Sequence, residues 1–227
     1  MTQPKSVVFL LDVDNTLLDN DKVTADLKRH LTKSFGAERQ ERYWAIFEDL
    51  RKELGYADYL GALQRYRIEN PRDPNFLEFS YYLLEYPFAN RLYPGSLDVI
   101  ERFNAWGQSV VLSDGDVIFQ PRKISRAGIY DAVEGRVLIY IHKELELSDV
   151  EKRFPADHYV MVDDKIRILT EMKKYWGTLM TAIFPRQGHY ALDPKIVSLY
   201  PPADITVERV GDLVGYDLET ILAAAKK

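Results

Sequence analysis

Short, unbroken apolar runs that end in polar residues recur along the chain. Residues 7–11 read VVFLL, and the runs VVL at 110–112 and VMV at 160–162 have the same character. Such runs, rich in β-branched residues, are typical of strands buried on both faces of a parallel sheet. Three further segments have strand character, at 137–141, 178–184 and 203–207. These segments predict a parallel β-sheet.

The segments between these strands carry helical patterns. Pro94 and Gly95 precede a helical stripe that runs from Leu97 to Phe103 and stops before Gly107. Further helices are expected at 121–128, 148–153 and 165–175. Strands that alternate with helices in this way predict an α/β fold, a Rossmann-like parallel sheet with helices on both faces.

Residues 22–86 interrupt this alternation with a long, polar, helical block. Tyr43, Phe47, Leu50 and Leu54 have the i, i+4, i+7, i+11 spacing of one stripe on an amphipathic helix. Two more stripes follow, and glycines and prolines separate the helical segments (Gly36, Gly55, Pro71, Pro74). We expect an inserted α-helical bundle at 19–92, and a core made of residues 1–18 and 93–227.

Composition removes several classes of function. The net charge of −5 gives no general reason to bind nucleic acid or an acidic membrane. The chain has no cysteine, which excludes disulfides, thiolate metal sites and cysteine nucleophiles. No apolar stretch approaches the ~20 residues of a membrane span. The apolar run after Lys5 is too short for a signal peptide. We expect a cytoplasmic protein, and the oligomeric state stays open.

Polar side chains stand where three of the expected strands end. Asp12 and Asp14 follow the first, Ser113 ends the second, and Asp163 and Asp164 end the fourth. The carboxyl ends of parallel strands meet at one edge of a sheet, where α/β proteins bind ligands. Buried carboxylates need a cation or hydrogen bonds to compensate them. Oxygen ligands of this type are those that Mg²⁺ prefers, so we expect Mg²⁺ as the cofactor.

These residues resemble the motifs of the haloacid dehalogenase (HAD) superfamily. Residues 12–17 read DVDNTL, similar to the first motif, DxDGT or DxDNT. Ser113, Lys143 and the pair Asp163–Asp164 match the second, third and fourth motifs in order. The helical insertion also lies where this superfamily places its first type of cap domain. Four elements in the right order make the resemblance specific.

The resemblance implies a role for each of these residues. Asp12 would be the nucleophile that forms an aspartyl-phosphate, and Asp14 the acid and base for the leaving oxygen and the attacking water. Ser113 would bind a phosphoryl oxygen, and Lys143 would hold the charge on Asp12 and the phosphate.

It also implies a metal site and a phosphate cradle. Asp12, the backbone carbonyl of Asp14, and Asp163 or Asp164 would hold Mg²⁺. Backbone N–H groups near Asp114 and Gly115 would bind the substrate phosphate.

Two departures from the family pattern leave choices open. The position of the last acid in the common GDxxxD form of the fourth motif is Ile168 here. Alignment of the double-Asp form with GD favours Asp164 over Asp163 as the direct ligand. Lys123 is a rival to Lys143 for the third motif, and we favour Lys143 because it directly follows an expected strand.

Each of these residues also has a simpler interpretation. The aspartates and Ser113 are common at strand ends and as helix caps, and Lys143 beside Glu144 fits a solvated surface. Arg186 and His189, after the fifth expected strand, could reach the rim of the site, although a structural loop is the favoured interpretation. The aromatic residues of the insertion fit a bundle core better than a substrate pocket, and we expect one or two tyrosines or arginines of this insertion to face the site.

The sequence therefore predicts a Mg²⁺-dependent phosphomonoester hydrolase that acts on a small phosphorylated metabolite. A phosphomutase uses the same residues, and a non-catalytic module that binds Mg²⁺ or phosphate would keep some of them. Dehalogenases and phosphonatases of the superfamily lack an acid at the position of Asp14. We therefore place dehalogenation last among the alternatives.

Overall fold

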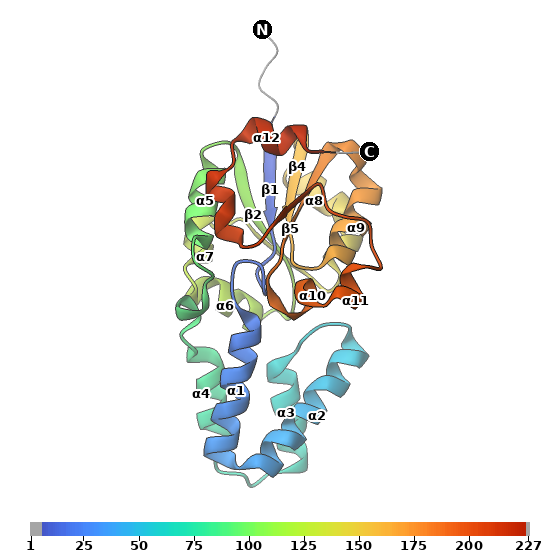
Figure 1. Ribbon diagram of the computed structural model, residues 1–227. Coiled ribbons are helices and arrows are strands. Elements are labelled where there is room, and N and C mark those ends of the chain that lie inside the picture. Colours follow the sequence, from blue (N-terminus) through green and yellow to red (C-terminus); the bar gives the residue numbers. More distant parts are fainter. Residues whose placement is uncertain (1–5, 226–227) are drawn as a thin grey trace.

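The computed structural model describes residues 6–225 and contains a six-stranded sheet whose paired strands are all parallel (Figure 1). The strand order is β3-β2-β1-β4-β5-β6, which places β1 in the interior of the sheet. The strands are β1 Val7–Leu11, β2 Gln108–Asp114, β3 Val137–Tyr140, β4 His158–Val162, β5 Met180–Pro185 and β6 Ile205–Val207. The predicted α/β fold with a parallel sheet is confirmed.

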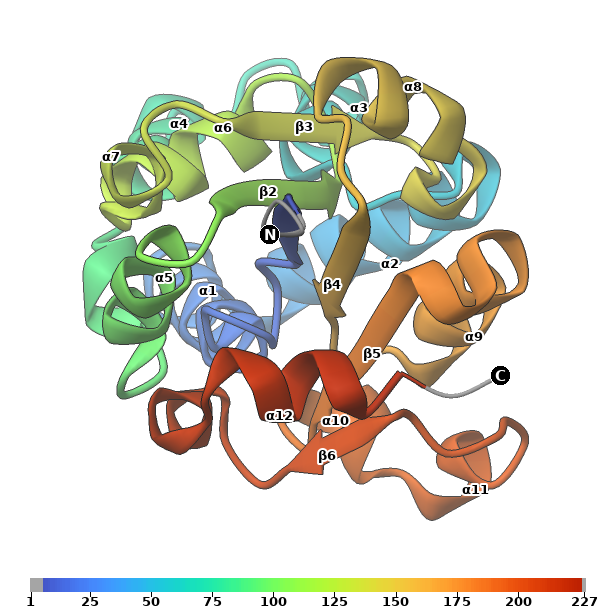
Figure 2. The ribbon, with the colours of Figure 1, turned by 90° about the horizontal axis from the view of Figure 1, so that it is seen from above.

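The two faces of the sheet are covered by separate sets of helices (Figure 2). Side chains alternate along β1, so that Phe9 packs in one apolar cluster and Leu10 in the other. Among the helices outside residues 20–85, those that contribute to the cluster of Phe9 include α5 Ser96–Asn104, α6 Phe119–Arg126, α7 Ile129–Ala132 and α12 Leu218–Ala223. Two main helices pack in the cluster of Leu10: α8 Leu147–Arg153 and α9 Ile166–Trp176. Burial on both faces is why these strands read as unbroken apolar runs.

Shorter helical turns complete the core. They are η1 Phe88–Arg91, η2 Lys143–Leu145, η3 Gly177–Leu179, α10 Gly188–Leu192, α11 Pro194–Val197 and η4 Val210–Gly215. Those that follow β5 were not predicted, because segments of this length show too few turns for a helical period. Among residues 6–225, no helix has the length and apolar character needed to cross a membrane.

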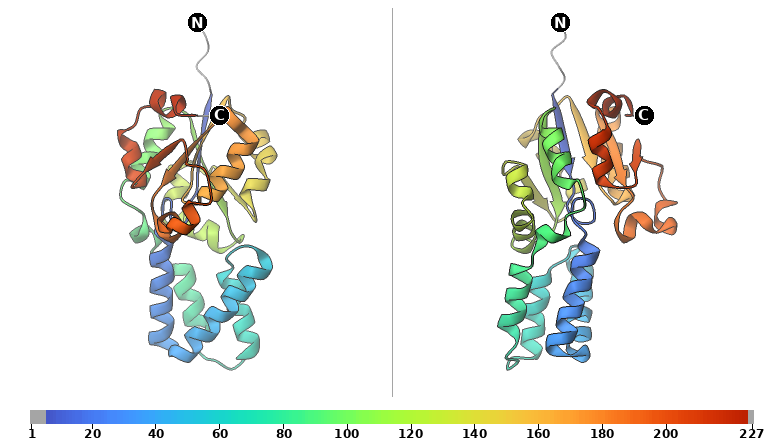
Figure 3. Two further views of the ribbon diagram at one scale, coloured as in Figure 1. Left: turned by 45° about the vertical axis from the view of Figure 1, so that its right-hand side comes forward. Right: turned by 60° about the vertical axis from the view of Figure 1, so that its left-hand side comes forward.

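Residues 20–85, between β1 and α5, form a bundle of four helices beyond the carboxyl ends of the strands (Figures 1 and 3). The helices are α1 Asn20–Phe35, α2 Ala37–Leu54, α3 Tyr59–Glu69 and α4 Phe76–Glu85. Asp19 caps α1 by accepting a hydrogen bond from the N–H of Lys22. We call these four helices the helical insertion.

Two backbone hydrogen bonds pair the chain segments that enter and leave the insertion. The N–H of Asp19 donates to the carbonyl of Arg91 at 2.7 Å, and the N–H of Tyr93 donates to the carbonyl of Leu17 at 3.0 Å. The chain therefore enters and leaves the insertion side by side, directly after the DVDNTL segment.

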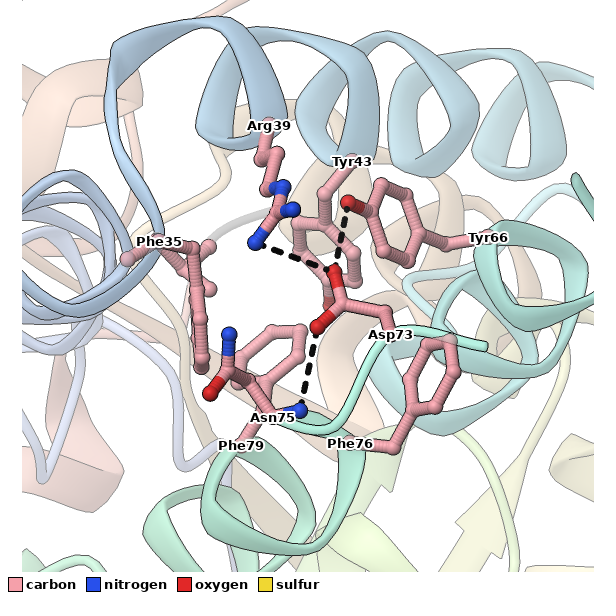
Figure 4. Close-up of a pocket in the computed structure, with 9 residues that line it drawn as sticks. Phe35, Arg39, Tyr43, Tyr66, Asp73, Asn75, Phe76 and Phe79 are labelled. Carbon is pink, nitrogen blue, oxygen red and sulfur yellow. Dashed lines mark hydrogen bonds and ion pairs between the residues drawn. The ribbon is translucent and has the colours of Figure 1, made fainter. Parts of the chain in front are cut away.

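A small pocket within the insertion is closed by Asp73, in the loop between α3 and α4 (Figure 4). Its carboxylate lies 3.4 Å from Arg39 and accepts hydrogen bonds from the Tyr66 hydroxyl at 3.4 Å and the Asn75 N–H at 3.0 Å. The cavity measures about 10 Å³, room for about one water molecule. These contacts fix the loop and leave no space for a substrate.

Candidate active site

Three carboxylates from two neighbouring strands meet at the carboxyl edge of the sheet. Asp12 follows β1, Asp163 and Asp164 follow β4, and the N–H of Asp12 donates to the carbonyl of Val162 at 3.0 Å. All three side chains are buried, and one oxygen from each lies within 4.8 Å of the others. The convergence expected from a parallel sheet is therefore present.

Lys143 lies among these carboxylates and is itself buried. Its Nζ donates to Asp12 Oδ1 at 2.5 Å and lies 2.7 Å from Asp163 Oδ2. Burial alone would lower the pKa of Lys143, but the charges of Asp12, Asp163 and Asp114 outweigh it and raise that pKa above its usual range. The side chain therefore stays a cation and orients one oxygen of Asp12.

Lys143 does not provide a hydrogen-bond donor for every oxygen of these three carboxylates. Asp12 Oδ2 and both oxygens of Asp164 are buried without a hydrogen-bond donor among the described residues. Burial raises the pKa of Asp164 well above its ordinary value, and the charges of Asp163 and Asp12 raise it further. Burial also raises the pKa of Asp163, to about 6. Oxygens that are free, close together and costly to ionise fit a divalent cation such as Mg²⁺.

A fourth acid, Asp14, belongs to the same edge but has a different partner. Its Oδ1 accepts a hydrogen bond from Lys123 Nζ at 2.6 Å, and this ammonium also binds Asn20 Oδ1 at 3.0 Å. The Asp14 carboxylate lies outside the group of three, so only its backbone carbonyl remains a candidate for the metal. Both lysines considered from the sequence are therefore at the site, Lys143 on Asp12 and Lys123 on Asp14.

The residues after Asp14 turn the chain sharply. Asn15 has φ 62°, in the left-handed region that asparagine tolerates better than most residues. Its side chain bonds Asp21 at the start of α1, and the Thr16 hydroxyl accepts the N–H of Asp164 at 2.9 Å. Gly188 leaves room for this turn, because a Cβ there would lie 2.4 Å from Asn15 Cβ. The motif thus joins the first strand, the fourth strand and the insertion.

Ser113 lies one residue before the end of β2 instead of at its end, and its hydroxyl is already engaged in hydrogen bonds. It accepts a hydrogen bond from Gln120 Nε2 at 3.0 Å and lies 3.3 Å from the carbonyl of Asp114. Gly115 allows Gln120 to approach, since a Cβ at this position would lie 2.9 Å from Gln120 Cβ. Gln120 was not predicted, because it sits on a helix seven residues away with no motif of its own.

The structure differs from the phosphate-binding site expected at Asp114 and Gly115, because groups of both residues already form other hydrogen bonds. The Gly115 N–H donates to the carbonyl of Tyr140 at 3.0 Å, so in this structure it is not available to a phosphate. The Asp114 carboxylate accepts the N–H of Lys143 at 2.7 Å and thereby fixes the start of η2. Both residues line the cavity next to the site, but these two contacts are structural.

A cavity of about 420 Å³ separates this edge from the helical insertion. Asp14, Lys123 and Lys165 line it from the core. Lys165 was not assigned from the sequence. Burial lowers its pKa, but Asp12, Asp164 and Asp163 together raise that pKa above the usual value, so it adds a third cation to the site.

The structure shows which of the less certain candidates, Arg186, His189 and the aromatic residues of the insertion, line the cavity. Arg186 forms an exposed ion pair with Glu208 and does not line the cavity. His189 does line the cavity, and its Nδ1 lies 2.6 Å from Asp21 Oδ1. From the insertion, Tyr56 and Tyr59 reach the cavity. Most of the other aromatic residues of the insertion pack within its core.

These residues and their order match a known enzyme family. A profile of haloacid dehalogenase-like hydrolases matches residues 7–172. The chain belongs to this family. None of the curated proteins is significantly similar in sequence to this hydrolase.

Solved structures agree with the family assignment. A haloacid dehalogenase-like hydrolase from Burkholderia xenovorans is 64% identical, with a TM-score of 0.89, over 94% of this chain and 100% of that one. The L-2-haloacid dehalogenase from Xanthobacter autotrophicus is 18% identical, with a TM-score of 0.58, over 92% of this chain and 96% of that one. A magnesium-bound hydrolase from Bacillus subtilis is 14% identical, with a TM-score of 0.58, over 93% and 98% of the two chains. The last two show that the hydrolase shares their fold.

Proposed function

We propose that this hydrolase cleaves small phosphomonoesters with Mg²⁺, through an aspartyl-phosphate on Asp12. The observation that carries the proposal is the position of Asp14. This residue is the second carboxylate of the DVDNTL segment, two residues after the proposed nucleophile Asp12, and it lines the cavity. An alkoxide leaving group needs a proton, whereas a halide does not. An acid at this position therefore favours cleavage of a phosphate ester over dehalogenation.

In the first half-reaction, a carboxylate oxygen of Asp12 attacks the phosphorus atom. Lys143 holds Oδ1 of Asp12, while Oδ2 has no hydrogen-bond donor within residues 6–225. As the oxygen–phosphorus bond to Asp12 forms, the bond from phosphorus to the ester oxygen breaks. Asp14 gives its proton to that oxygen, and the alcohol leaves.

In the second half-reaction, water attacks the phosphorus of the aspartyl-phosphate. Asp14, now a carboxylate, takes a proton from this water, and the bond between phosphorus and Asp12 breaks. Inorganic phosphate leaves and both aspartates return to their starting states. Lys123 keeps the Asp14 side chain in place by donating a hydrogen bond to Oδ1 at 2.6 Å, so that Oδ2 is the oxygen that carries the transferred proton.

Asp12, Asp164 and the backbone carbonyl of Asp14 are the groups that we propose to hold Mg²⁺. Asp164 is preferred over Asp163, because neither of its oxygens has a donor in the described part of the chain, whereas Asp163 already contacts Lys143 and accepts the N–H of Lys165. When bound, the cation neutralises charge on the phosphoryl group that would otherwise repel the attacking carboxylate.

Dehalogenation is the second candidate, because the fold is shared with an L-2-haloacid dehalogenase. The test measures phosphate release from p-nitrophenyl phosphate and alkyl phosphates, and chloride release from 2-chloropropionate, with and without Mg²⁺. We expect Mg²⁺-dependent phosphate release that Asp12→Asn abolishes. Chloride release without phosphate release would overturn the proposal.

The variant Asp14→Asn sharpens the test. p-Nitrophenolate is a good leaving group that needs no proton, whereas an alkoxide needs one. Formation of the aspartyl-phosphate from alkyl phosphates should fall about 10²–10⁴-fold, and much less from p-nitrophenyl phosphate. Equal losses with both esters would contradict the role of Asp14 as general acid.

A further inference from the structure

The wall of the cavity that faces the catalytic edge comes from two helices of the insertion. Asn20, Thr24 and Lys28 are spaced by four residues on α1, so they share one face. Trp44, Phe47, Glu48 and Arg51 form the matching face of α2. This wall includes two cations that no step of the proposed reaction uses, Lys28 and Arg51.

Lys28 is partly buried beside the cavity and lacks an anionic partner. Its Nζ lies 4.2 Å from the centre of the Trp44 ring, in a cation–π contact. Among residues 6–225, no carboxylate lies within 4.0 Å of this ammonium. The nearby Asp21, which also lines the cavity, is already bound by the N–H of His189 and the amide of Asn15.

Arg51 is held toward the cavity by the core. Its Nη2 donates to the Tyr190 hydroxyl at 2.5 Å, and its Nη1 lies 3.7 Å from Glu48 Oε2. The Glu48 contact is long for a charge-assisted hydrogen bond, and the Arg51 side chain is 41% exposed. Donor groups of this guanidinium therefore remain free for a ligand.

We propose that Lys28 and Arg51 bind a second anionic group of the substrate, at the end remote from the scissile phosphate. This inference rests on the proposed hydrolysis of phosphomonoesters and names the class within it. Lys143 and Lys165 at the sheet edge are the cations that would bind the scissile phosphate. Lys28 and Arg51 of the insertion are therefore available to bind a different anionic group of the substrate. The carbon chain of the substrate lies against Trp44, in a cavity large enough only for a small metabolite.

The second anionic group can be a carboxylate or another phosphate, and matched substrates separate the two. 3-Phosphoglycerate differs from glycerol 3-phosphate by a carboxylate in place of a hydroxymethyl group. Fructose 1,6-bisphosphate differs from fructose 6-phosphate by a second phosphate. We expect at least one member with two anionic groups (dianionic in this sense, whatever its total charge) to have the higher kcat/KM, and the pair that shows it identifies the group. Equal or lower values for both dianionic members would overturn the inference.

The variants Lys28→Met and Arg51→Met remove each charge and keep an apolar side chain. A charge-assisted hydrogen bond of about 1.5–3 kcal/mol corresponds to about a 10- to 100-fold loss of kcat/KM on the preferred dianionic substrate. The loss should appear mainly in KM, and kcat/KM for the partner that lacks the second anionic group should change less than about threefold. Lys33→Met on α1 and Lys52→Met on α2, both exposed, are the matched controls. An equal loss on both members of a pair would contradict the inference.

Glu48→Gln tests the same idea in the opposite direction. Removal of the carboxylate beside Arg51 should raise the affinity for the dianionic substrate severalfold, an outcome that impaired folding does not produce. An unchanged or lower affinity would contradict the role of Arg51.

Calorimetric binding to Asp12→Asn makes the result independent of turnover. Suppose that Asp12→Asn binds the dianionic member of a pair more tightly, and that adding Lys28→Met to this variant removes the preference. The proposed anion subsite is then supported even if wild type releases no phosphate. In that case the proposed hydrolysis fails alone. If Asp12→Asn binds both members equally while wild type hydrolyses them, the anion subsite fails alone.

Discussion

The helical insertion and the sheet edge both bury carboxylates, and they surround them differently. In the insertion, Asp26 on α1 is 8% exposed and has a partner on each oxygen. Its Oδ2 accepts hydrogen bonds from the Tyr86 hydroxyl at 2.6 Å and from Arg91 at 2.5 and 3.0 Å, while Oδ1 lies 3.2 Å from Arg29. Burial alone would raise the pKa of Asp26, but these partners outweigh it and lower that pKa below its ordinary value.

At the sheet edge, Asp12, Asp163 and Asp164 are at least as deeply buried, and Lys143 forms ion pairs with Asp12 and Asp163 but not with Asp164. The pKa values of Asp163 and Asp164 are raised rather than lowered. The opposite directions have a physical meaning. The insertion uses a carboxylate to hold its helices together, whereas the core keeps carboxylates whose compensation must come from a ligand.

The largest effect that tests this difference is expected for Asp164→Asn. Activity with Mg²⁺ should fall about 10²–10³-fold, because a metal contributes several kcal/mol to stabilising the transition state. In Mg²⁺-free buffer at neutral pH, the same variant should gain about 1–3 kcal/mol in free energy of unfolding, because a repelling carboxylate without a donor is removed. Urea unfolding in EDTA and steady-state kinetics measure the two effects.

Asp131→Asn is the control for this variant, since it removes an exposed carboxylate on α7. It should change neither quantity measurably. A loss of stability for Asp164→Asn in EDTA would show that Asp164 has a structural partner, and the contrast between the two regions would then be wrong.

Asp26→Asn should have the opposite outcome. The free energy of unfolding should fall by about 2–3 kcal/mol, because hydrogen bonds from two charged or polar donors lose their anionic acceptor. kcat should change little, since Asp26 does not line the cavity. Asp49→Asn, at an exposed position on α2, is the matched control and should leave stability unchanged.

The pH dependence of this difference follows from the lowered pKa of Asp26. A carboxyl group with a lower pKa in the folded state stabilises the protein above the unfolded-state pKa of about 3.9. That stabilisation is lost as the pH falls through the folded-state pKa. The gap between wild type and Asp26→Asn should therefore be wide at pH 7 and close at pH values below about 4. A gap that stays constant in urea titrations at pH 7, 5 and 3.5 would show that lost packing, not charge, causes the effect.

Much of the fold could be predicted because burial on two faces leaves a plain trace in the sequence. β1 and β4 are surrounded by other strands and helices, so VVFLL and HYVMV contain few polar residues. The position of Asp12 beside Asp163 then follows from parallel pairing alone. Short helices such as α10 and α11 could not be predicted, because four or five residues do not establish a helical period.

The contacts within the site were harder to predict, for a reason that the lysines illustrate. Lys123 and Asp14 are 109 positions apart, and their pairing depends on how α6 packs beneath the insertion. Lys123 lies on α6 and Lys143 follows β3, and neither position in the sequence shows that each lysine binds a different aspartate. The wall formed by Lys28 and Arg51 depends on the orientation of the insertion, which no local pattern encodes.

The smallest of these effects is the stabilisation by Mg²⁺ itself, and it should depend on pH. At a Mg²⁺ concentration ten times its Kd, binding should add about 1.4 kcal/mol at pH 7.5, measured as a rise in Tm against buffer of equal ionic strength. Burial raises the pKa of Asp163 to about 6, above that of the unfolded chain, so the metal-free protein loses stability as the pH rises from about 4 to about 6. At pH 5 the cation must displace protons from the carboxyl groups, and the rise in Tm should shrink.

The Mg²⁺-dependent rise in Tm should differ between Asp164→Asn at the sheet edge and Asp26→Asn in the insertion. Asp164→Asn should abolish the Mg²⁺-dependent rise at pH 7.5, whereas Asp26→Asn should lower the Tm and keep the rise, because the paired carboxylate of the insertion has no oxygen to offer. A rise that survives in Asp164→Asn would place the cation elsewhere in the protein. A rise in Tm of equal size at pH 5 and pH 7.5 would mean that Asp163 and Asp164 are already ionised at pH 5 without metal. Lys143 and Lys165 alone would then have to compensate the charges of the carboxylates at the sheet edge.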